Sequence, residues 1–373
     1  MTKIESAIPS YLLVIASSCQ MYSGTGTAIF DWVRYAKNRF RFHIIMDVEN
    51  DANFTMVQQF CAEHGVSFTP ARGLAIAGCI DSGINEINAL LESTEFDFIE
   101  CVSWANAATN ISVLQSQRGN AKLIFVPHSQ PQWTLPDPQR YFMVPIAFEQ
   151  MLRAANYIFV DSPTETKLDA FKMVHQESVH FVPLGVAPEF CHAPTIQVKQ
   201  TQILCICDCT EQRKRIDLLL DVFARTLVWN PSVRLVLGGK GSNEVIIPEN
   251  IRFAVTALGY VSRSTLISLY QSSVLFILLS DYEAFGLPIA EALCCGCPVL
   301  LNDLDVLRDL FSGMPGVHFI KNSDIEQASR IVHKLLGNRF DRAAIALAAT
   351  SAFSFDVTYG SKCKIILADR CVQ

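Results

Sequence analysis

The feature of this sequence that most constrains the fold lies between residues 274 and 301. The apolar run Val274–Leu279 predicts a buried strand, and the segment after it reads SDYEAFGLPIAEALCCGCPVLL. A polar loop with a glycine and a proline comes first, a helix-like run then ends at Gly296, and Pro298–Leu301 predicts a second strand. Strand, loop, helix and strand in this order form the unit of a parallel sheet. The sequence therefore predicts an α/β fold.

The junction between this loop and this helix has the chemistry of an anion site. Gly286 permits a close backbone approach or a positive φ, and Pro288 suits the first helical position. Free N–H groups and the positive end of the helix dipole favour an anion there. Glu283 and Glu291 bracket the site, so one can face a bound group and the other can accept hydrogen bonds from two hydroxyls. A nucleotide sugar offers both an anionic diphosphate and a pair of vicinal hydroxyls. An ordinary turn with two solvated glutamates remains the alternative.

The composition is that of a globular protein with a large buried core. Half of the 373 residues are hydrophobic and 18% are charged, and this length suggests two or three domains. A net charge of −6 and the lack of a long basic run give no reason to expect a nucleic-acid partner. We expect no transmembrane segment, and we read Tyr11–Ala16 as a first strand rather than a signal peptide. With 13 cysteines and no secretion signal, we expect reduced thiols and a cytoplasmic location.

Apolar runs alternate with helical patterns along the whole chain, which predicts two doubly wound domains. We place the boundary after the linker-like stretch 182–188, with one domain over residues 1–190 and a second over residues 200–350. Ligands of such sheets bind beyond the carboxyl ends of the strands, and the cleft between two such domains is a natural ligand site. The expected strands are Tyr11–Ala16, Phe42–Met46, Phe96–Val102, Leu123–Val126, Tyr157–Val160, Ile203–Ile206, Val233–Leu237, Ile251–Val255, Val274–Leu279, Val299–Leu301 and Val317–Ile320.

The segment 280–301 resembles the retaining GT-B glycosyltransferases of family 4, also called glycosyl transferases group 1. The signature of that family is a pair of glutamates separated by seven residues, in a setting of glycines and prolines. Ala284 stands where the family has a glycine. The matching positions are Ser280, Glu283, Phe285, Gly286, Leu287, Pro288, Glu291, Gly296 and Pro298.

The resemblance continues over most of the chain. The further matching segments are Ser23–Thr27 with Gly24 and Gly26, Val126–His128, Val182–Val186, Arg213 with Lys214, Leu235–Gly241 with Gly239, and Leu258–Ser262 with Tyr260 and Val261. Besides Ala284, two further positions depart from the family pattern. Cys209 stands where the family often has an arginine, and Phe355 stands where a tryptophan is usual. A variant of the pattern places arginine directly beside lysine, as Arg213 is placed here.

The resemblance implies a role for each of these positions in binding the donor. Glu291 would hold the ribose hydroxyls, and Glu283 would lie beside the donor sugar. Arg213 and Lys214 would neutralise the diphosphate as it leaves. His128 would contact the donor sugar, a purely structural histidine being the alternative, and no dedicated base is needed. The remaining nucleotide-sugar contacts would come from Gly24, Gly26, Gly239, Tyr260, Val261, Phe285, Gly286 and Leu287.

Three other patterns suggest sites that we do not adopt. Cys205, Cys207 and Cys209 alternate along a strand, but no second cysteine or histidine cluster with zinc spacing accompanies them. Asp303–Asp305 has the spacing of a metal-binding D-x-D motif, yet the resemblance places it in an ordinary loop. Phe30–Phe42 mixes basic and aromatic residues and could touch a membrane, although a solvated helix face is the simpler interpretation. We expect no metal and no cofactor, the nucleotide sugar being a co-substrate.

The sequence thus predicts a retaining GT-B hexosyltransferase with two Rossmann-like domains that face each other across a cleft. The C-terminal domain would bind the nucleotide sugar, with a UDP-sugar favoured and a GDP-sugar possible, and the N-terminal domain an unidentified acceptor. As in the family, residues 351–373 would return to the first domain. A GT-B epimerase, a phosphorylase or an inactive partner subunit are the alternatives. The sugar, the acceptor and a homodimeric state are left open.

Overall fold

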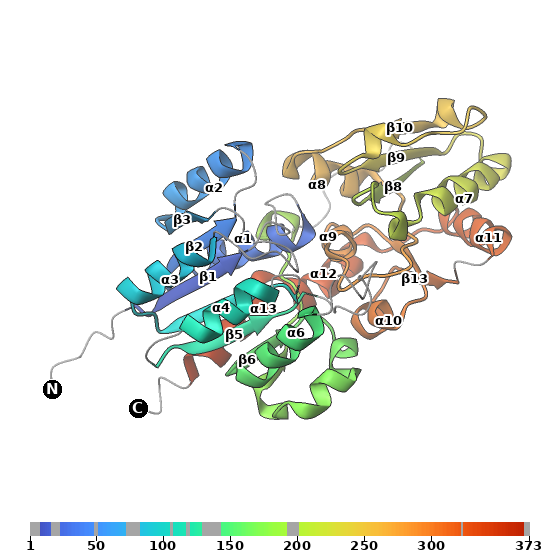
Figure 1. The fold of residues 1–373 in the computed structure, drawn as a ribbon. Helices are drawn as coiled ribbons and strands as arrows, with labels where there is room; N and C mark the ends of the chain where they lie inside the picture. Colours follow the sequence, from blue (N-terminus) through green and yellow to red (C-terminus); the bar gives the residue numbers. More distant parts are fainter. Residues whose placement is uncertain are drawn as a thin grey trace. The chain divides into compact units, whose positions relative to one another are not determined.

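The chain forms two compact units. The structure, a computed structural model, describes residues 8–15, 23–47, 51–71, 83–104, 107–116, 120–128, 143–191, 201–321 and 324–368. The N-terminal unit comprises Met1–Pro183 together with Tyr359–Gln373, and the C-terminal unit comprises Leu184–Thr358. Each unit is a parallel sheet with helices around it (Figure 1).

The N-terminal unit contains a seven-stranded sheet in the order β3-β2-β1-β4-β5-β6-β7, and all its strand pairs are parallel. Successive strands are joined by helices, as parallel pairing requires. The strands are β1 (Ser10–Ile15), β2 (Arg41–Asp47), β3 (Ser67–Ala71), β4 (Phe98–Val102), β5 (Lys122–Val126), β6 (Tyr157–Val160) and β7 (Val179–Phe181). The helices are α1 (Gly24–Ala36), α2 (Asp51–His64), α3 (Gly83–Ser93), α4 (Ala107–Ser116), α6 (Met143–Ala154) and the last helix, α13 (Phe355–Ala368).

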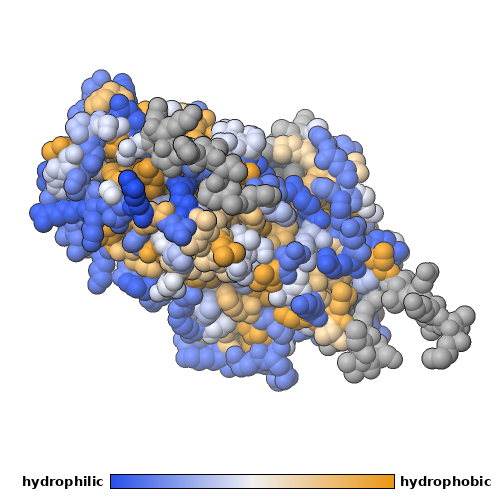
Figure 2. Space-filling model, turned by 180° about the vertical axis from the view of Figure 1, so that it is seen from behind, coloured by the Kyte–Doolittle hydropathy of each residue, from blue (hydrophilic) through white to orange (hydrophobic). Residues whose placement is uncertain are grey.

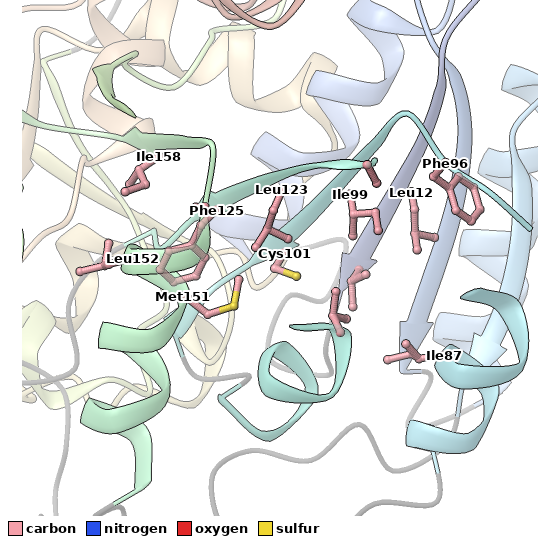
Figure 3. Packing of buried hydrophobic residues seen from close by; sticks show 14 of the residues in the cluster. Leu12, Ile87, Phe96, Ile99, Cys101, Leu123, Phe125, Met151, Leu152 and Ile158 are labelled. Carbon is pink, nitrogen blue, oxygen red and sulfur yellow. The ribbon is translucent and has the colours of Figure 1, made fainter. Parts of the chain in front are cut away.

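One face of this sheet carries an apolar core. Alternate residues of the central strands point to the same side of the sheet, and on this face they meet side chains of α3, α4 and α6 (Figure 3). Figure 3 shows Phe125 of β5 close to Met151 and Leu152 of α6. This burial holds β4, β5 and β6 in fixed register, and with them the loops at their carboxyl ends.

The opposite face buries an ion pair between Glu100 of β4 and Lys362 of α13. The Lys362 ammonium lies 3.1 and 2.8 Å from the two oxygens of the carboxylate, and both side chains are less than a tenth exposed. Tyr11 of β1 donates its hydroxyl proton to the same carboxylate. The ammonium also lies 4.4 Å from the ring centre of Trp32, a cation–π contact. This cluster ties the end of the chain to the central strands of the N-terminal unit.

The C-terminal unit repeats the same topology with six parallel strands in the order β10-β9-β8-β11-β12-β13. The strands are β8 (Gln202–Ile206), β9 (Arg234–Gly238), β10 (Val255–Ala257), β11 (Leu275–Leu278), β12 (Val299–Asn302) and β13 (Val317–Ile320). The helices are α7 (Ile216–Trp229), α8 (Arg263–Ser272), α9 (Leu287–Cys294), α10 (Asp305–Phe311), α11 (Ile325–Leu336) and α12 (Arg342–Phe353). Helix α7 packs against α11, and α9 packs against α12.

The predicted unit of strand, loop, helix and strand is confirmed as β11, α9 and β12, and the predicted pair of parallel α/β sheets is confirmed with it. The strand expected at Ile251–Val255 is wrong, because residues 252–254 form a turn of 3₁₀ helix (η8, Arg252–Ala254) and the strand begins only at Val255. Ile251 and Ala254 are nevertheless buried. These apolar residues face the core, and in the sequence they resemble the apolar run of a strand. Strands β3 and β7 were not expected, since half-exposed edge strands lack a continuous apolar run.

The surface is mixed in polarity. Figure 2 shows one face of the molecule, on which hydrophobic residues lie in groups between hydrophilic ones. Within the described ranges, no helix has both the length and the apolar character needed to cross a lipid bilayer.

The buried ion pair predicts a large effect on stability. Lys362→Met should lower the free energy of unfolding by about 3–5 kcal/mol, because it leaves the Glu100 carboxylate buried without its cation. The double variant Glu100→Gln, Lys362→Met should recover much of this loss. Lys364→Met, on an exposed position of the same helix, should change stability by less than about 0.5 kcal/mol. Urea unfolding followed by tryptophan fluorescence measures all three, and equal losses in the two lysine variants would contradict the assignment.

Candidate functional site

The predicted donor residues of the C-terminal unit gather where its strand order reverses. Strands β8 and β11 are neighbours, and the chain leaves them toward opposite halves of the sheet. The loops beyond such a reversal point form the usual ligand site of a doubly wound sheet. Here they are residues 207–215 after β8 and residues 279–286 after β11. The backbone N–H of Asp281 donates to the carbonyl of Arg213 over 2.8 Å, which joins the two loops directly.

Glu283, Lys214 and Arg213 meet at this junction. The Lys214 ammonium lies 2.6 Å from one oxygen of the Glu283 carboxylate. An Arg213 Nη lies 3.9 Å from the other oxygen and donates a hydrogen bond of 2.9 Å to the carbonyl of Tyr282. Glu283 is only 5% exposed, whereas about a third of the Arg213 side chain is exposed. The structure therefore brings together the three residues that the sequence assigned to the phosphate and to the sugar.

Electrostatics keep the Glu283 carboxylate ionised. Burial alone would raise the pKa of Glu283, but the charges of Lys214 and Arg213 outweigh burial and hold the pKa below its ordinary value. Arg215, the next residue, adopts a left-handed backbone with φ of +50° and contacts Asp217 and Asp281. These contacts hold the basic loop against the loop that carries Glu283.

The start of α9 lies beside this ion pair. Gly286 caps the helix with φ of +88°, a conformation that favours glycine. We expected Pro288 at the first position of this helix. Helix α9 begins at Leu287, so Pro288 occupies the second position instead. Within the described part of the chain, the backbone N–H groups of Phe285, Gly286 and Leu287 have no hydrogen-bond partner. Such groups at a helix N-terminus suit a bound anion.

Glu291 lies in the second turn of α9 and is 8% exposed. The hydroxyl of Tyr270, on α8, donates to one of its oxygens over 3.1 Å. Burial and the nearby carboxylate both raise the pKa of the fully buried Tyr270 well above its ordinary value, so the phenol remains a donor. The guanidinium of Arg342 in turn bonds the carbonyls of Tyr270, Gln271 and Ser273 over 2.7–3.0 Å. Sequence reasoning gave Tyr270 no role, since only the fold brings α8 next to α9.

Two further loops of the same sheet carry predicted donor residues. Gly239 follows β9 with φ of +105°, and a Cβ there would lie 2.1 Å from the carbonyl oxygen of Cys207, so only glycine fits. Its N–H donates to the carbonyl of Gly259 over 2.8 Å. Tyr260 is 59% exposed, and Val261 is half-buried. Both follow β10 and lie at the same edge of the sheet as Gly239.

An open hollow of about 760 Å³ borders the basic loop. Its walls combine guanidinium, carboxylate and hydroxyl groups. The lining residues are Cys209, Thr210, Glu211, Gln212, Arg213, Arg215, Ile216, Asp217 and Asp281. Arg213 is therefore the residue shared by the hollow and the Glu283 ion pair.

The other predicted residues, His128, Gly24 and Gly26, lie in the N-terminal unit. His128 follows β5, and its Nδ1 lies 2.8 Å from a carboxylate oxygen of Asp161, which follows β6. Gly24 and Gly26 form the first turn of α1 rather than a loop before it, and the Ser23 hydroxyl caps the helix by accepting from the N–H of Gly26 over 2.9 Å. Asp161 is a contact of His128 that sequence reasoning did not find.

The described residues contain no group of three histidine, cysteine, aspartate or glutamate side chains that could hold a metal ion. The sulfur atoms of Cys205, Cys207 and Cys209 form a row with spacings of 3.9 and 3.8 Å. Asp303, from the rejected D-x-D pattern, pairs with Arg308.

The comparisons with known proteins agree with this geometry. The family model described as Glycosyl transferases group 1 matches residues 192–351, a range that contains Arg213, Lys214, Glu283 and Glu291. This part of the chain, which is less than half of its 373 residues, is similar to that family. Among curated relatives, the chain is 31% identical over 148 residues to O-antigen chain mannosyltransferase B of Escherichia coli, and 27% identical over 160 residues to mannosylfructose-phosphate synthase of Agrobacterium fabrum. Each match covers 39% of this chain but only 36% and 32% of these relatives, about a third of their length.

The likeness to solved structures shows that the fold is GT-B. Sucrose-phosphate synthase from Thermosynechococcus elongatus superposes with a TM-score of 0.75 at 14% identity, over 97% of this chain and 100% of the other. HepE of Anabaena, in complex with UDP and glucose, superposes with a TM-score of 0.77 at 15% identity and the same coverage. At such low identity the likeness shows the fold alone.

The Glu283–Lys214 pair predicts a change in the pH dependence of stability. Because the native pKa of Glu283 is depressed, its contribution in the wild type is present above the unfolded pKa and is lost as the pH falls through the native pKa. In Lys214→Met, burial should dominate and raise the native pKa. The free energy of unfolding of this variant should then fall as the pH rises from about 5 to 8. Lys334→Met, exposed on α11, is the control. Urea unfolding at several pH values measures the slope, and a variant slope equal to that of the wild type would contradict this account.

Proposed function

We propose that this chain is a retaining glycosyltransferase that transfers a hexose from a nucleotide sugar to an acceptor hydroxyl. The observation that carries the proposal is the buried, ionised Glu283, held by Lys214 and Arg213 beside the open start of α9. Cations, unpaired N–H groups and one carboxylate at a single strand end suit a substrate that bears both a diphosphate and an electron-poor sugar carbon.

The cations and the carboxylate of this site would each stabilise a charge that develops during glycosyl transfer. The bond between the anomeric carbon and the phosphate oxygen breaks, so the leaving diphosphate gains negative charge, and Lys214 and Arg213 would stabilise it. The anomeric carbon gains positive charge, and the ionised Glu283 would stabilise that charge. The N–H groups at the start of α9 would bind phosphate or sugar oxygens. The leaving phosphate would accept the proton of the acceptor hydroxyl, so the new bond would form on the face that the leaving group occupied.

Glu291 would bind the nucleoside part of the donor. A carboxylate can accept hydrogen bonds from two vicinal ribose hydroxyls, and Tyr270 fixes the orientation of this carboxylate. We propose UDP as the nucleotide, supported by the fold likeness to HepE, which was solved with UDP. A hexose is supported by the relatives named for mannosyl transfer and mannosylfructose phosphate synthesis. The acceptor would bind to the N-terminal unit.

The proposal predicts binding of a nucleoside diphosphate that depends on Glu291. UDP at saturating concentration should raise the melting temperature of the wild type, because a ligand that binds only the native state stabilises it. Glu291→Ala should weaken UDP binding roughly tenfold to a hundredfold, as expected for the loss of hydrogen bonds to a charged group. Tyr270→Phe should weaken it by a smaller factor. Isothermal titration calorimetry measures the affinities. Glu249→Ala, at a surface glutamate, is the matched control. Unchanged affinity in Glu291→Ala would contradict this role.

Glu283→Gln should mainly slow turnover. The amide keeps the size of the side chain but loses the charge that opposes the developing cation, so kcat should fall by about 10²–10³-fold while UDP affinity changes far less. Release of UDP from UDP-hexoses, with and without candidate acceptors, measures turnover. Glu249→Gln is the control. A loss of UDP affinity as large as the loss of kcat would place Glu283 in ground-state binding instead.

A further inference from the structure

A contact between an imidazole and a carboxylate, those of His128 and Asp161, lies in the N-terminal unit at the carboxyl ends of β5 and β6. In the register of these strands Ile124 lies opposite Tyr157, an offset of 33 residues, since 157 − 124 = 33. His128 and Asp161 are separated by the same 33 residues. The two residues therefore keep the offset of the paired strands, three positions beyond the last printed pair, Phe125 with Ile158.

The contact is close and shielded. The distance from His128 Nδ1 to Asp161 Oδ2 is 2.8 Å, and the side chains are only 8% and 4% exposed. The backbone of His128 is left-handed, with φ of +50°, which is uncommon for a residue other than glycine. Among the described residues, only Ser103, His128 and Arg215 have a positive φ without being glycine. All three follow sheet strands at ligand-side loops, and such backbone strain is concentrated at functional sites.

A third residue, Glu165, lies in the short helix that follows Asp161. Ser162-Pro-Thr-Glu165 opens the short helix η2 (Pro163–Lys167) with Ser162 as its N-cap. Glu165 is fully buried, and its backbone N–H donates to the carbonyl of Ser162 over 3.2 Å. Burial and the charge of Asp161 raise the pKa of Glu165 well above its ordinary value. The loop that carries Asp161 is thereby fixed.

We propose that Asp161 is a positioning residue that fixes His128 in a single tautomer, so that Nε2 accepts a hydrogen bond from a hydroxyl of a substrate sugar. A carboxylate can only accept hydrogen bonds, so the ring nitrogen facing it, Nδ1, must carry a proton. In the neutral imidazole Nε2 then has a lone pair. The inference rests on the proposed function only for the identity of the hydroxyl. The tautomer follows from the contact itself.

The tautomer can be measured without any activity. Two-dimensional ¹H–¹⁵N spectra of protein labelled in histidine, assigned with His128→Gln, distinguish a protonated ring nitrogen from one with a lone pair. In spectra recorded at a pH where the ring carries one proton, we expect the wild type to show a single tautomer with that proton on Nδ1. Asp161→Asn should lose this preference, because a carboxylate-to-amide change in such a pair keeps the shape but alters the tautomer. Asp169→Asn, at an exposed aspartate of the neighbouring helix η3 (Asp169–Met173), should match the wild type.

The kinetic consequence separates positioning from a structural role. Asp161→Asn should lower kcat by about tenfold to a hundredfold, the loss typical of a misplaced group, with UDP affinity unchanged. In a His128→Ala background, Asp161→Asn should have no further effect on kcat, because Asp161 acts only through His128. Circular dichroism and the melting temperature identify any variant that has not folded, and Asp161→Ser then replaces it.

The outcomes are distinct. Loss of the tautomer in Asp161→Asn, together with non-additive kinetics, supports the proposal. A tautomer with the proton on Nε2 in the wild type, or additive losses in the double variant, overturns it. Should the wild type bind no UDP and release none from any UDP-hexose, the proposed function fails, yet the spectra still decide the tautomer of His128.

Discussion

The site depends on one constraint, which is that a buried carboxylate needs a partner that balances its charge. Glu283 is almost fully buried, yet its pKa lies below the ordinary value because Lys214 and Arg213 are in place. Without these cations, burial would neutralise the side chain. The ion pair therefore does two things at once. It preserves a negative charge in a shielded position, and it holds the loop after β8 against the loop after β11, so that the reversal point of the sheet has a defined shape.

Three other buried carboxylates likewise lie against a group that can donate a proton to a hydrogen bond. Glu291 is oriented by the phenol of Tyr270, Asp161 by the imidazole of His128, and Glu100 by the ammonium of Lys362. The first two lie where substrate would be expected, whereas the third lies within the core and joins α13 to the N-terminal sheet. A buried carboxylate with a donor partner thus lies at the expected substrate site in two places, and in a third it joins a helix to the sheet. Position relative to the carboxyl ends of the strands distinguishes the two uses.

Local sequence patterns made part of the fold and part of the candidate site predictable. The order of strand, loop, helix and strand in residues 274–301, the glycine at the start of α9 and the pair of glutamates all lie within one short segment, where periodicity and helix-end chemistry apply directly. The partners of these groups lie far away in sequence. Tyr270 reaches Glu291 because α8 packs beside α9, Asp161 reaches His128 by strand register, and Lys362 reaches Glu100 across 262 positions. No local pattern encodes such contacts, since sheet order and helix packing decide them.

The ion pair at Glu283 and the proposed chemistry make competing demands on Lys214. In the described structure the ammonium nitrogen of Lys214 lies 2.6 Å from a carboxylate oxygen of Glu283. An arriving diphosphate would offer Lys214 a second and more highly charged partner, and Arg213, about a third of whose side chain is exposed, could also turn toward the phosphate. As negative charge grew on the leaving group, Lys214 would be drawn toward it, and the field of Glu283 would be less neutralised at the moment when the sugar carbon becomes positive. A carboxylate that is screened in the resting site and less screened during the reaction stabilises the transition state more than the ground state, which is the condition for catalysis.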